Sequence, residues 1–384
     1  LPISVTRCFD VRATTLGDGE VWVRARQDGV PLVTLELRFR VVSGAPQPGR
    51  AVQPASVAEV SGVQPPAHQL TIFERRDGDR LSYQFILDSP SLGWKHVFES
   101  APIHGDRQAY IDSRYAEIEQ RWIGSAQDRD LFQEELRALG GRLLDELFPA
   151  DLQRLLWDRR DAVTGILVYS EEPFIPWEMV HLKEPGKPLG SETRFLAQLG
   201  LVRWLHQRGA NGRGGYPPER ILLRPGRCRY VIPEYPDPSW ALPEAAEERR
   251  FLESSLGATA LEPQAIPVRQ LLAGPGAFDL FHFAGHGEAE SANIAGARLL
   301  LQGRVDNQHQ WIPASLGEAT VAQFASLIDA SGNRPVVTLN ACQAGRAGYH
   351  LTGIGGFARA FLGAGAGLFV GSSWSVGDAP ARTF

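Results

Sequence analysis

Short apolar segments alternate with helical segments from residue 165 of this 384-residue chain onward. The runs with the length and composition of buried strands are Gly165–Tyr169, Arg220–Arg224, Phe278–Ala284, Pro335–Asn340 and Gly367–Ser372. Segments with the apolar spacing of helices precede or separate them, at Ala109–Trp122, Asp128–Phe148, Pro243–Leu256, Val321–Ala330 and Gly355–Leu362. This alternation predicts an α/β fold in which helices cover both faces of a mostly parallel sheet. Such a sheet places its functional residues just beyond the carboxyl ends of its strands.

The N-terminal part of the chain has a different pattern, which is typical of short β-strands. The alternating or β-branched runs are Val21–Ala25, Val33–Phe39 and Leu81–Leu87, and Asp77-Gly78 suits a tight hairpin. Residues 43–66 are rich in Pro, Gly, Ala and Gln, which indicates a linker or mobile loop. We therefore expect a β-rich N-terminal region at residues 1–100 and an α/β domain at residues 101–384. The strands before and after the loop need not belong to one domain.

Composition limits the classes of partner that we expect. The formal net charge is -5, so no nucleic-acid partner is expected, because phosphate binding needs a basic face. No run of apolar residues is long enough for a membrane span. The three cysteines, Cys8, Cys228 and Cys342, cannot build a disulfide framework and have no zinc-finger spacing. Without a signal-peptide pattern, we expect a cytoplasmic protein that needs neither metal nor cofactor.

Both ends of the sequence suggest a piece of a longer product. The only methionine is Met179, so residue 1 is not a translation start. Residues 378–384 have the pattern of a helix that has just begun, which indicates a domain that is cut there or loses order. We expect a regulatory domain or a regulatory partner upstream.

Two of the predicted strands end in a reactive side chain beside small residues. Phe278–Ala284 leads into a glycine and His286, and Pro335–Asn340 leads into an alanine and Cys342. A histidine and a cysteine at the tips of neighbouring strands can come within hydrogen-bond reach, and an imidazole near a thiol favours the attacking thiolate. Glycine leaves main-chain N–H groups free to hold an oxyanion, so the N–H groups of Gly287 and Cys342 are candidates for that role.

Each of these features also has a purely structural interpretation. A cysteine after an apolar strand is more often a small buried side chain than a nucleophile, and a His-Gly pair is usually a turn. The joint position of His286 and Cys342 at two successive strand ends favours a catalytic dyad. Spacing and strand context alone do not name a family.

The segments around both residues resemble the two signature blocks of CHAT-domain proteins, the caspase-like peptidases related to separase. These blocks are Phe281–Gly287 and Val337–Gly345. Supporting blocks occur in the family's order, namely a Pro-Trp-Glu segment at Phe174–Met179, a small-residue helix at Gly355–Ala366 and a Trp-x-Val-x-Asp segment at Gly371–Asp378. The resemblance covers residues 105 to 384.

The resemblance implies a caspase-like sheet and a cysteine endopeptidase that cleaves a protein partner. It assigns His286 as the general base and Cys342 as the nucleophile of an acyl-enzyme mechanism, with Gly287 as the oxyanion partner. Relatives serve in bacterial defence and cell death, so an effector role is expected from kinship. The alternative is a catalytically silent CHAT-fold interaction or scaffold module. An intact histidine and cysteine argue against that alternative.

Substrate preference depends on two further residues. P1 is the substrate residue just before the cleaved bond. In clan relatives, the residue two positions before the nucleophile helps to line the pocket for the P1 side chain. In this chain that residue is Asn340, which is neutral. Asp378 matches an acidic residue that is thought to face this pocket in separase-like proteins. A carboxylate there would select Arg or Lys through a charge-assisted contact. Asp378 is equally well placed to cap a helix beginning at Ala379, and both interpretations stay open.

Several other polar residues are expected to support the fold. His282 lies four residues before His286, a spacing that does not align two rings on a strand, so we expect a core or supporting residue rather than a metal ligand. Trp177 is expected to be a packed indole, and Glu178 a partner for a buried polar group. A solvated face is expected for Arg220, Arg224, Arg227 and Arg229.

Overall fold

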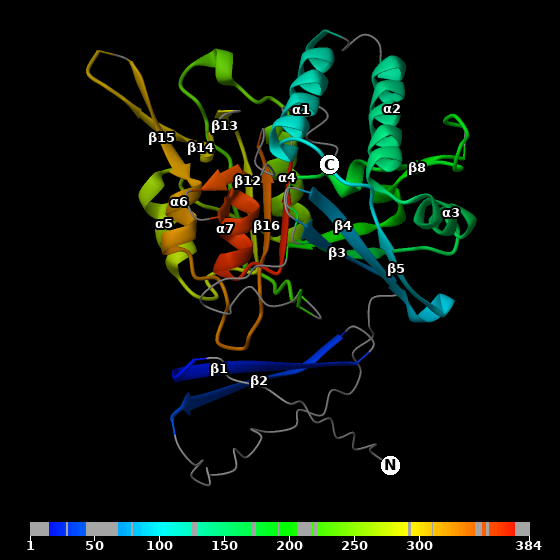
Figure 1. Ribbon diagram of the computed structural model, residues 1–384. Helices are drawn as coiled ribbons and strands as arrows, with labels where there is room; N and C mark the ends of the chain where they lie inside the picture. The colour runs from blue at the N-terminus through cyan, green and yellow to red at the C-terminus, as the bar shows by residue number, and fades with distance from the viewer. Residues whose placement is uncertain are drawn as a thin grey trace. The chain divides into compact units, whose positions relative to one another are not determined.

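The computed structural model describes most of the chain. The described residues are 15–27, 30–43, 68–77, 80–124, 129–170, 172, 174–190, 192–205, 217–218, 221–290, 293–308, 310–341, 348–350 and 353–372. The chain divides into two compact units, residues 1–66 and residues 67–384. In the first unit, β1 (Gly17–Gln27) and β2 (Val30–Val41) form the antiparallel hairpin drawn in blue in Figure 1. Both strands were predicted; the predicted loop at 43–66 lies outside the described residues except for Ser43.

The first sheet of the second unit joins strands from two distant parts of the chain. Its order is β5-β4-β3-β6-β9, with the bounds Trp94–Glu99, Arg80–Ser89, His68–Asp77, Ile166–Ser170 and Leu201–Leu205. β3 and β4 form the antiparallel hairpin predicted around residue 77, whereas β3 pairs in parallel with β6. The segment 68–99, which the sequence assigns to the N-terminal region, therefore shares a sheet with strands of the α/β domain.

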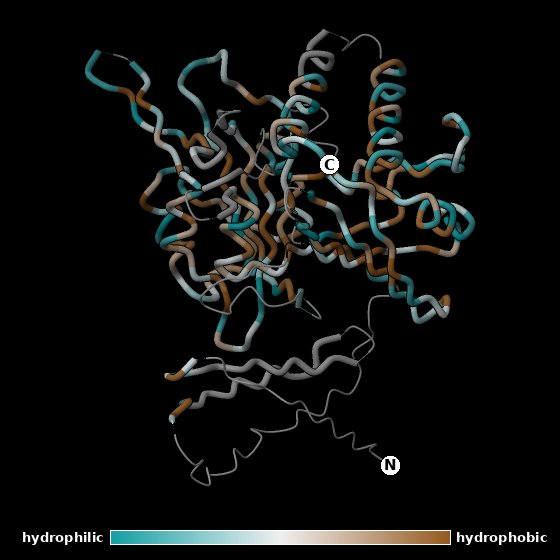
Figure 2. The backbone as a smooth tube through the Cα atoms, viewed as in Figure 1, coloured by the Kyte–Doolittle hydropathy of each residue, from teal (hydrophilic) through white to brown (hydrophobic). Residues whose placement is uncertain are grey.

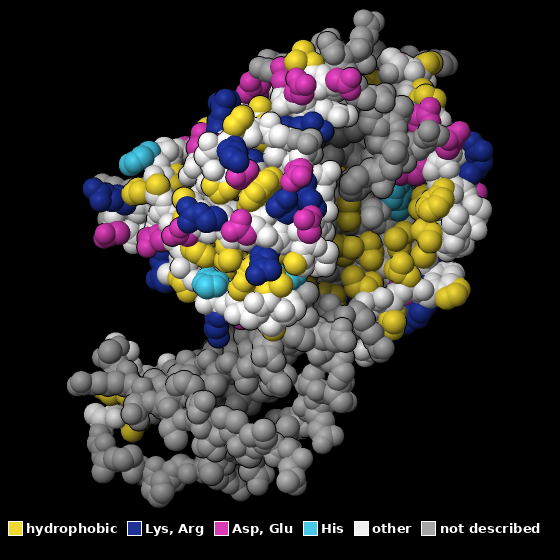
Figure 3. All heavy atoms as spheres, turned by 90° about the vertical axis from the view of Figure 1, so that its right-hand side faces the viewer, with side chains coloured by type: hydrophobic (Ala, Val, Ile, Leu, Met, Phe, Trp, Pro, Cys, Tyr) yellow, Lys and Arg dark blue, Asp and Glu magenta, His cyan; other side chains and the backbone are white. Residues whose placement is uncertain are grey.

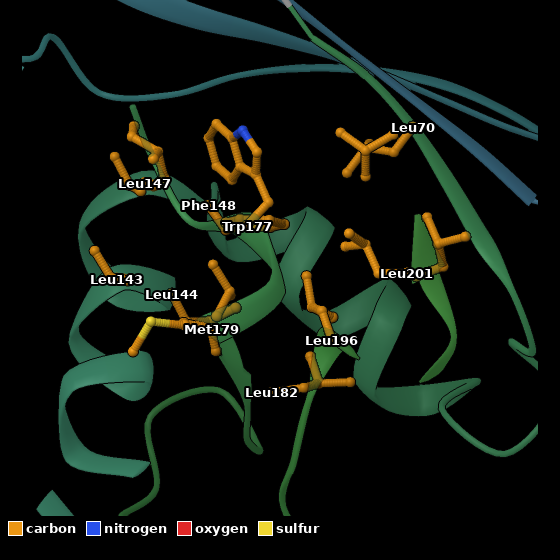
Figure 4. Packing of buried hydrophobic residues seen from close by; sticks show 14 of the residues in the cluster. Leu70, Leu143, Leu144, Leu147, Phe148, Trp177, Met179, Leu182, Leu196 and Leu201 are labelled. Carbon is orange, nitrogen blue, oxygen red and sulfur yellow. The ribbon is translucent and has the colours of Figure 1, made fainter. Parts of the chain in front are cut away.

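Three helices pack on one face of this sheet and enclose a hydrophobic core. They are α1 (Arg107–Gly124), α2 (Arg129–Leu147) and α3 (Ala150–Asp158). Trp177 lies at the centre of the core with no exposed surface, and its ring centroid is 5.7 to 6.0 Å from those of Tyr83, Phe85 and Phe148. Figure 4 shows its indole among leucine side chains from several elements. The predicted structural role of Trp177 is confirmed.

Short elements connect these helices and strands. They are the 3-10 helices η1 (Pro90–Leu92), η2 (Trp177–Met179) and η3 (Leu196–Leu199) and the two-residue strands β7 (His181–Leu182) and β8 (Arg194–Phe195). Glu178, in η2, lies 3.2 Å from Nε of Arg203 on β9. Glu178 therefore has a charged partner, but both side chains are partly exposed, so the partner is not the buried polar group that was predicted.

The second sheet is entirely parallel. Its order is β11-β10-β12-β16-β19, with the bounds Thr259–Ala260, Cys228–Val231, Leu280–Ala284, Val336–Asn340 and Leu368–Gly371. Figure 1 shows its central strands between the helices of the second unit, and Figure 2 shows that these strands are largely hydrophobic. The sequence prediction of a mostly parallel sheet in an α/β fold is confirmed.

Two strands predicted for this sheet are not part of it. The predicted strand Gly165–Tyr169 does form, as β6, but β6 belongs to the first, mixed sheet. Residues 221–224 are not a strand, because side chains take up their main-chain groups: Leu222 N–H donates to Asn333 Oδ1 at 3.0 Å, and Arg224 N–H donates to Asp279 Oδ2 at 2.9 Å. The strand begins instead at Cys228, after a turn at Gly226 with a φ of 73°. Glycine adopts this left-handed conformation at little steric cost, so the chain can turn between residues 221–224 and β10.

The prediction of a solvated arginine face is wrong for Arg224 and Arg227, which form ion pairs, whereas Arg220 lies outside the described residues. The guanidinium Nη2 of Arg224 lies 2.6 Å from Asp279 Oδ1 and 2.7 Å from Asp329 Oδ2, and Nε of Arg227 lies 3.2 Å from Asp279 Oδ1. Burial disfavours the ionised form of Asp279, but the hydrogen bonds from Arg224 and Arg227 and the charge of Arg224 together outweigh it and lower the pKa of Asp279 to about 2. These ion pairs tie the turn to the start of β12.

Helices cover both faces of the parallel sheet. α4 (Ala245–Leu256) packs on the face that carries Leu280 and Ala284. The opposite face, with Phe281 and Phe283, packs in a cluster with residues of α5 (Ala265–Ala273), α6 (Glu318–Phe324) and α7 (Phe357–Ala364). Because successive strand residues point to opposite faces, one buried strand supplies both layers of the core.

Additional strands lie beyond the parallel sheet. β13 (Gly287–Glu290), β14 (Asn293–Val305) and β15 (Trp311–Gly317) form an antiparallel sheet, and β17 (Gly348–His350) pairs with β18 (Gly353–Gly355). A 3-10 helix, η4 (Pro238–Trp240), precedes α4. In the part of the chain that the structure describes, no helix has the length and hydrophobicity required to cross a bilayer. On the face shown in Figure 3, basic and acidic side chains are interspersed.

Candidate active site

The two predicted reactive strand ends lie side by side. β12 and β16 are neighbours in the parallel sheet, with Ala284 opposite Asn340, and Gly285 N–H donates to the carbonyl of Asn340 at 3.1 Å. His286 follows Ala284 by two residues, as Cys342 follows Asn340. The structure thus brings together the two strand ends that carry the predicted dyad. Cys342 itself belongs to residues 342–347, outside the described part of the chain.

The imidazole of His286 is oriented by a main-chain carbonyl. Its Nε2 lies 2.9 Å from the carbonyl oxygen of Trp240. Because a carbonyl can only accept, Nε2 carries the proton in the neutral ring and Nδ1 keeps its lone pair. The ring also packs against aromatic side chains, with its centroid 5.0 Å from those of Trp240 and Tyr235. This arrangement leaves Nδ1 as the nitrogen that can accept a proton.

The main chain of His286 is held on both sides. Its N–H donates to the Tyr235 hydroxyl at 2.9 Å, and its carbonyl accepts from Leu300 N–H at 2.9 Å. A Cβ at the preceding Gly285 would lie 2.8 Å from Tyr235 Oη and 2.7 Å from the Phe283 ring. Glycine is therefore required at residue 285 by this close approach, rather than by an unusual φ angle.

The peptide between His286 and Gly287 has a defined orientation. In a planar trans peptide, the C=O and the N–H point in opposite directions. Because β14 holds the His286 carbonyl through Leu300 N–H, the Gly287 N–H points away from β14. This N–H is the candidate oxyanion donor from the sequence, and its role stays a prediction because Cys342 lies outside the described residues.

A polar network lies on the α4 face of the same strand ends. Asn340 Nδ2 is 3.2 Å from both carboxylate oxygens of Glu248, and His282 Nε2 is 2.9 Å from Glu248 Oε1. His282 Nδ1 is 2.6 Å from the hydroxyl of Thr338. His282 is buried and belongs to this network, as the prediction of a core or supporting residue requires. Within the described residues, no group of three or more His, Cys, Asp or Glu side chains could hold a metal ion.

Sequence reasoning missed Glu248, although a signal for it was present. Ala245 and Leu252 are the buried residues of α4, three before and four after Glu248. Side chains at these spacings share one helix face, so Glu248 faces the sheet rather than the solvent. An acidic residue within an apolar helical stripe is the pattern that could have identified it.

Three aromatic side chains around His286 were also missed. Tyr235, Trp240 and Trp311 pack on one another with centroid separations of 5.4 to 6.3 Å. They come from the segment after β10 and from the first residue of β15, far from His286 in the sequence. No local pattern links them to the strand end that they surround.

Cys228 and Asp378 are two further residues that the sequence singles out. Cys228 is buried in β10, and burial raises the pKa of its thiol, as expected for an unreactive structural cysteine. Asp378 belongs to residues 373–384, outside the described part of the chain, so both interpretations of it remain predictions.

Comparison with protein families identifies the region that contains this site. The model of the CHAT domain matches residues 138–384, which is more than half of the chain. The match begins later than residue 105, from which the sequence resemblance was drawn, and includes His286, Asn340 and Cys342. A search of curated proteins finds no match.

Proposed function

The chain belongs to the CHAT-domain family of caspase-like peptidases, and on this basis we propose that it is a cysteine endopeptidase that cleaves a protein partner. The observation that carries this proposal is the position of His286. It lies beyond the end of β12, beside the strand that leads to Cys342, with its Nε2 proton directed to the Trp240 carbonyl. Nucleophilic catalysis by a cysteine needs a base beside the thiol, with one nitrogen free to accept the thiol proton.

In the proposed mechanism, His286 Nδ1 accepts the proton of the Cys342 thiol. The thiolate attacks the scissile carbonyl, and the N–H groups of Gly287 and Cys342 hold the resulting oxyanion. The imidazolium then donates its proton to the leaving amine, which gives an acyl-enzyme. Water activated by His286 hydrolyses this intermediate and regenerates the thiol. The Trp240 carbonyl accepts from Nε2 throughout, so the ring keeps its orientation while Nδ1 gains and loses the proton.

We propose a preference for Arg or Lys at P1, with Glu248 as the supporting observation. The neutral Asn340, two residues before Cys342, holds the Glu248 carboxylate through its side-chain amide. The Glu248 side chain is 16% exposed, so it is shielded but open to a neighbouring group. A partly desolvated carboxylate selects a basic side chain through a charge-assisted contact. Asp378 is the second proposed determinant.

The biological role proposed from family kinship is that of a bacterial effector in defence or cell death. A stimulus sensed by another domain or by a partner would switch on cleavage of a protein substrate. A reducing compartment such as the cytoplasm suits a free catalytic thiol. Neither a cofactor nor a metal takes part in the proposed chemistry.

The test is cleavage of a panel of fluorogenic peptides with basic, neutral and acidic P1 residues, under several activating conditions. The Cys342→Ala variant is the control for contaminating proteases. We expect Cys342-dependent cleavage that is fastest after Arg or Lys. If no condition gives Cys342-dependent cleavage, the chain is instead a catalytically silent CHAT-fold scaffold.

A further inference from the structure

Tyr235 interrupts a β-ladder at His286. β13 and β14 are antiparallel, with Gly287 opposite Leu299, so the same register places His286 opposite Leu300. Two residues in such a hydrogen-bonded pair normally exchange both of their main-chain bonds. Leu300 N–H does donate to the His286 carbonyl at 2.9 Å. The second bond, from His286 N–H to the Leu300 carbonyl, is replaced by a side chain.

The replacement is the hydroxyl of Tyr235. It accepts from His286 N–H at 2.9 Å and donates to the Leu300 carbonyl at 2.9 Å. The hydroxyl therefore bridges the two main-chain groups that would otherwise bond to each other: it accepts from one and donates to the other. Inserted in this way, it holds the His286 N–H away from β14. Its deletion leaves two main-chain groups either unpaired or free to close on each other.

The surroundings of Tyr235 hold this hydroxyl in place. Its ring packs against the rings of His286, Trp240 and Trp311, with centroid separations of 5.0, 6.3 and 5.6 Å. Gly285 leaves just enough room for the oxygen, since a Cβ there would lie 2.8 Å from it. Burial raises the pKa of Tyr235 to about 12, so the hydroxyl keeps its proton over the range in which imidazoles titrate.

We infer that Tyr235 is a positioning residue for the active site, which sets the main-chain position of His286 and, through it, the imidazole and the Gly287 N–H. The inference rests on the proposed function. Tyr235 holds the main-chain N–H of His286, Trp240 holds the ring Nε2, and Leu300 holds the carbonyl. The base and the candidate oxyanion donor are adjacent residues of one clamped segment, so a shift of that segment displaces both.

The test compares Tyr235→Phe with a matched hydroxyl deletion, Tyr230→Phe, in the full chain. Tyr230 lies in β10, and its hydroxyl donates to Glu253 rather than to the active site. In peptide cleavage, we expect Tyr235→Phe to lower kcat between about tenfold and 100-fold, because small displacements of catalytic groups have effects of this size. KM should change little. Tyr230→Phe should retain the wild-type kcat.

A second measurement does not depend on cleavage. In protein labelled with 15N-histidine, the His286 signals are assigned by their loss in His286→Asn. We expect the Nε2-protonated tautomer in the wild type and in Tyr230→Phe, and a tautomer mixture in Tyr235→Phe. If the wild type cleaves no peptide, the proposed function fails, but this spectrum still tests the role of Tyr235.

The inference is overturned if Tyr235→Phe has wild-type His286 signals, whether or not its activity falls. Activity that falls only in proportion to the folded fraction would also overturn it, so thermal unfolding of each variant is measured in parallel. Should Tyr235→Phe not fold, Gly285→Ala displaces the same hydroxyl by a different route. Unchanged His286 signals in that variant would contradict the inference equally.

Discussion

The carboxylate of Glu248 lies 3.2 Å, at both oxygens, from the side-chain amide nitrogen of Asn340. A helix residue thereby places a negative charge at the end of the strand that leads to Cys342. Asn340 is itself neutral, and the family resemblance implies only Asp378 as an acidic residue of the P1 pocket. In the proposed function, this contact makes Glu248 a second candidate for that role.

Glu248→Gln is expected to reduce the preference for basic P1 residues. The measurement is kcat/KM for matched peptides with Arg and citrulline at P1, and the ratio should fall by about tenfold, the effect of losing one charge-assisted contact of about 1.4 kcal/mol. Glu253→Gln, on the same helix but bound to Tyr230, is the control and should keep the ratio. If only Asp378→Asn lowers the ratio, Glu248 is not the determinant.

His286→Asn is expected to slow both cleavage and thiol alkylation. Loss of a general base costs about 10²- to 10⁴-fold, and iodoacetamide should modify Cys342 more slowly at neutral pH because less thiolate forms. Mass spectrometry of the modified peptide follows Cys342 alone. Cys228→Ala is the control, since Cys228 is buried, and its cleavage rate should match the wild type. An equal alkylation rate in His286→Asn would contradict the assignment of the base.

Trp177→Ala is expected to destabilise the second unit strongly. The indole has no exposed surface and contacts the rings of Tyr83, Phe85 and Phe148. Truncation of a buried aromatic residue costs about 3–5 kcal/mol. Denaturant unfolding measures this cost against Phe251→Ala, whose side chain is exposed and should change stability by less than about 0.5 kcal/mol. Similar midpoints for both variants would exclude Trp177 as a central core residue.

Glu172 is expected to make stability depend on pH. It is fully buried, and burial raises its pKa from 4.5 to about 7, although the N–H groups of Phe174 and Ile175 oppose this shift. Between those two values, the folded state binds more protons at Glu172 than the unfolded state does. The Glu172 contribution to the free energy of unfolding is therefore present below pH 4.5 and is lost as pH rises through about 7.

Between pH 4.5 and 6.5, His181 has the opposite effect to Glu172 on the pH dependence of stability. Burial lowers its pKa from 6.5 to about 4, so its contribution to stability falls as pH decreases through about 4. The difference between the wild type and Glu172→Gln isolates the Glu172 effect. The variant should gain stability relative to the wild type as pH rises from 5 to about 7; unfolding curves at several pH values measure this. A constant difference across that range would show that Glu172 does not titrate there.

A strand predicted from its apolar side chains was correct where its main-chain groups also pair with neighbouring strands. β12 is buried throughout, β16 is buried at Val337 and Leu339, and both pair with neighbouring strands, so their ends were placed correctly. Residues 221–224 also follow an apolar pattern, but the leucines at 222 and 223 are exposed, and side chains of Asn333 and Asp279 bind the main chain there. An apolar run does not reveal whether a strand or a distant side chain will satisfy its N–H groups.

The sequence by itself determined the α/β class, the three parallel strands β12, β16 and β19, the strand ends that lead to His286 and Cys342, and the family blocks around them. Strand and helix periodicity is local, and parallel strands bring their carboxyl ends to one edge, so this much follows from the order of residues. Only the tertiary structure decided which groups surround His286. The Trp240 carbonyl, the Tyr235 hydroxyl and, on the neighbouring strand end, Glu248 all come from segments about 40 to 90 residues away. Such polar contacts depend on how loops and helices pack on the sheet, and no periodic pattern encodes them.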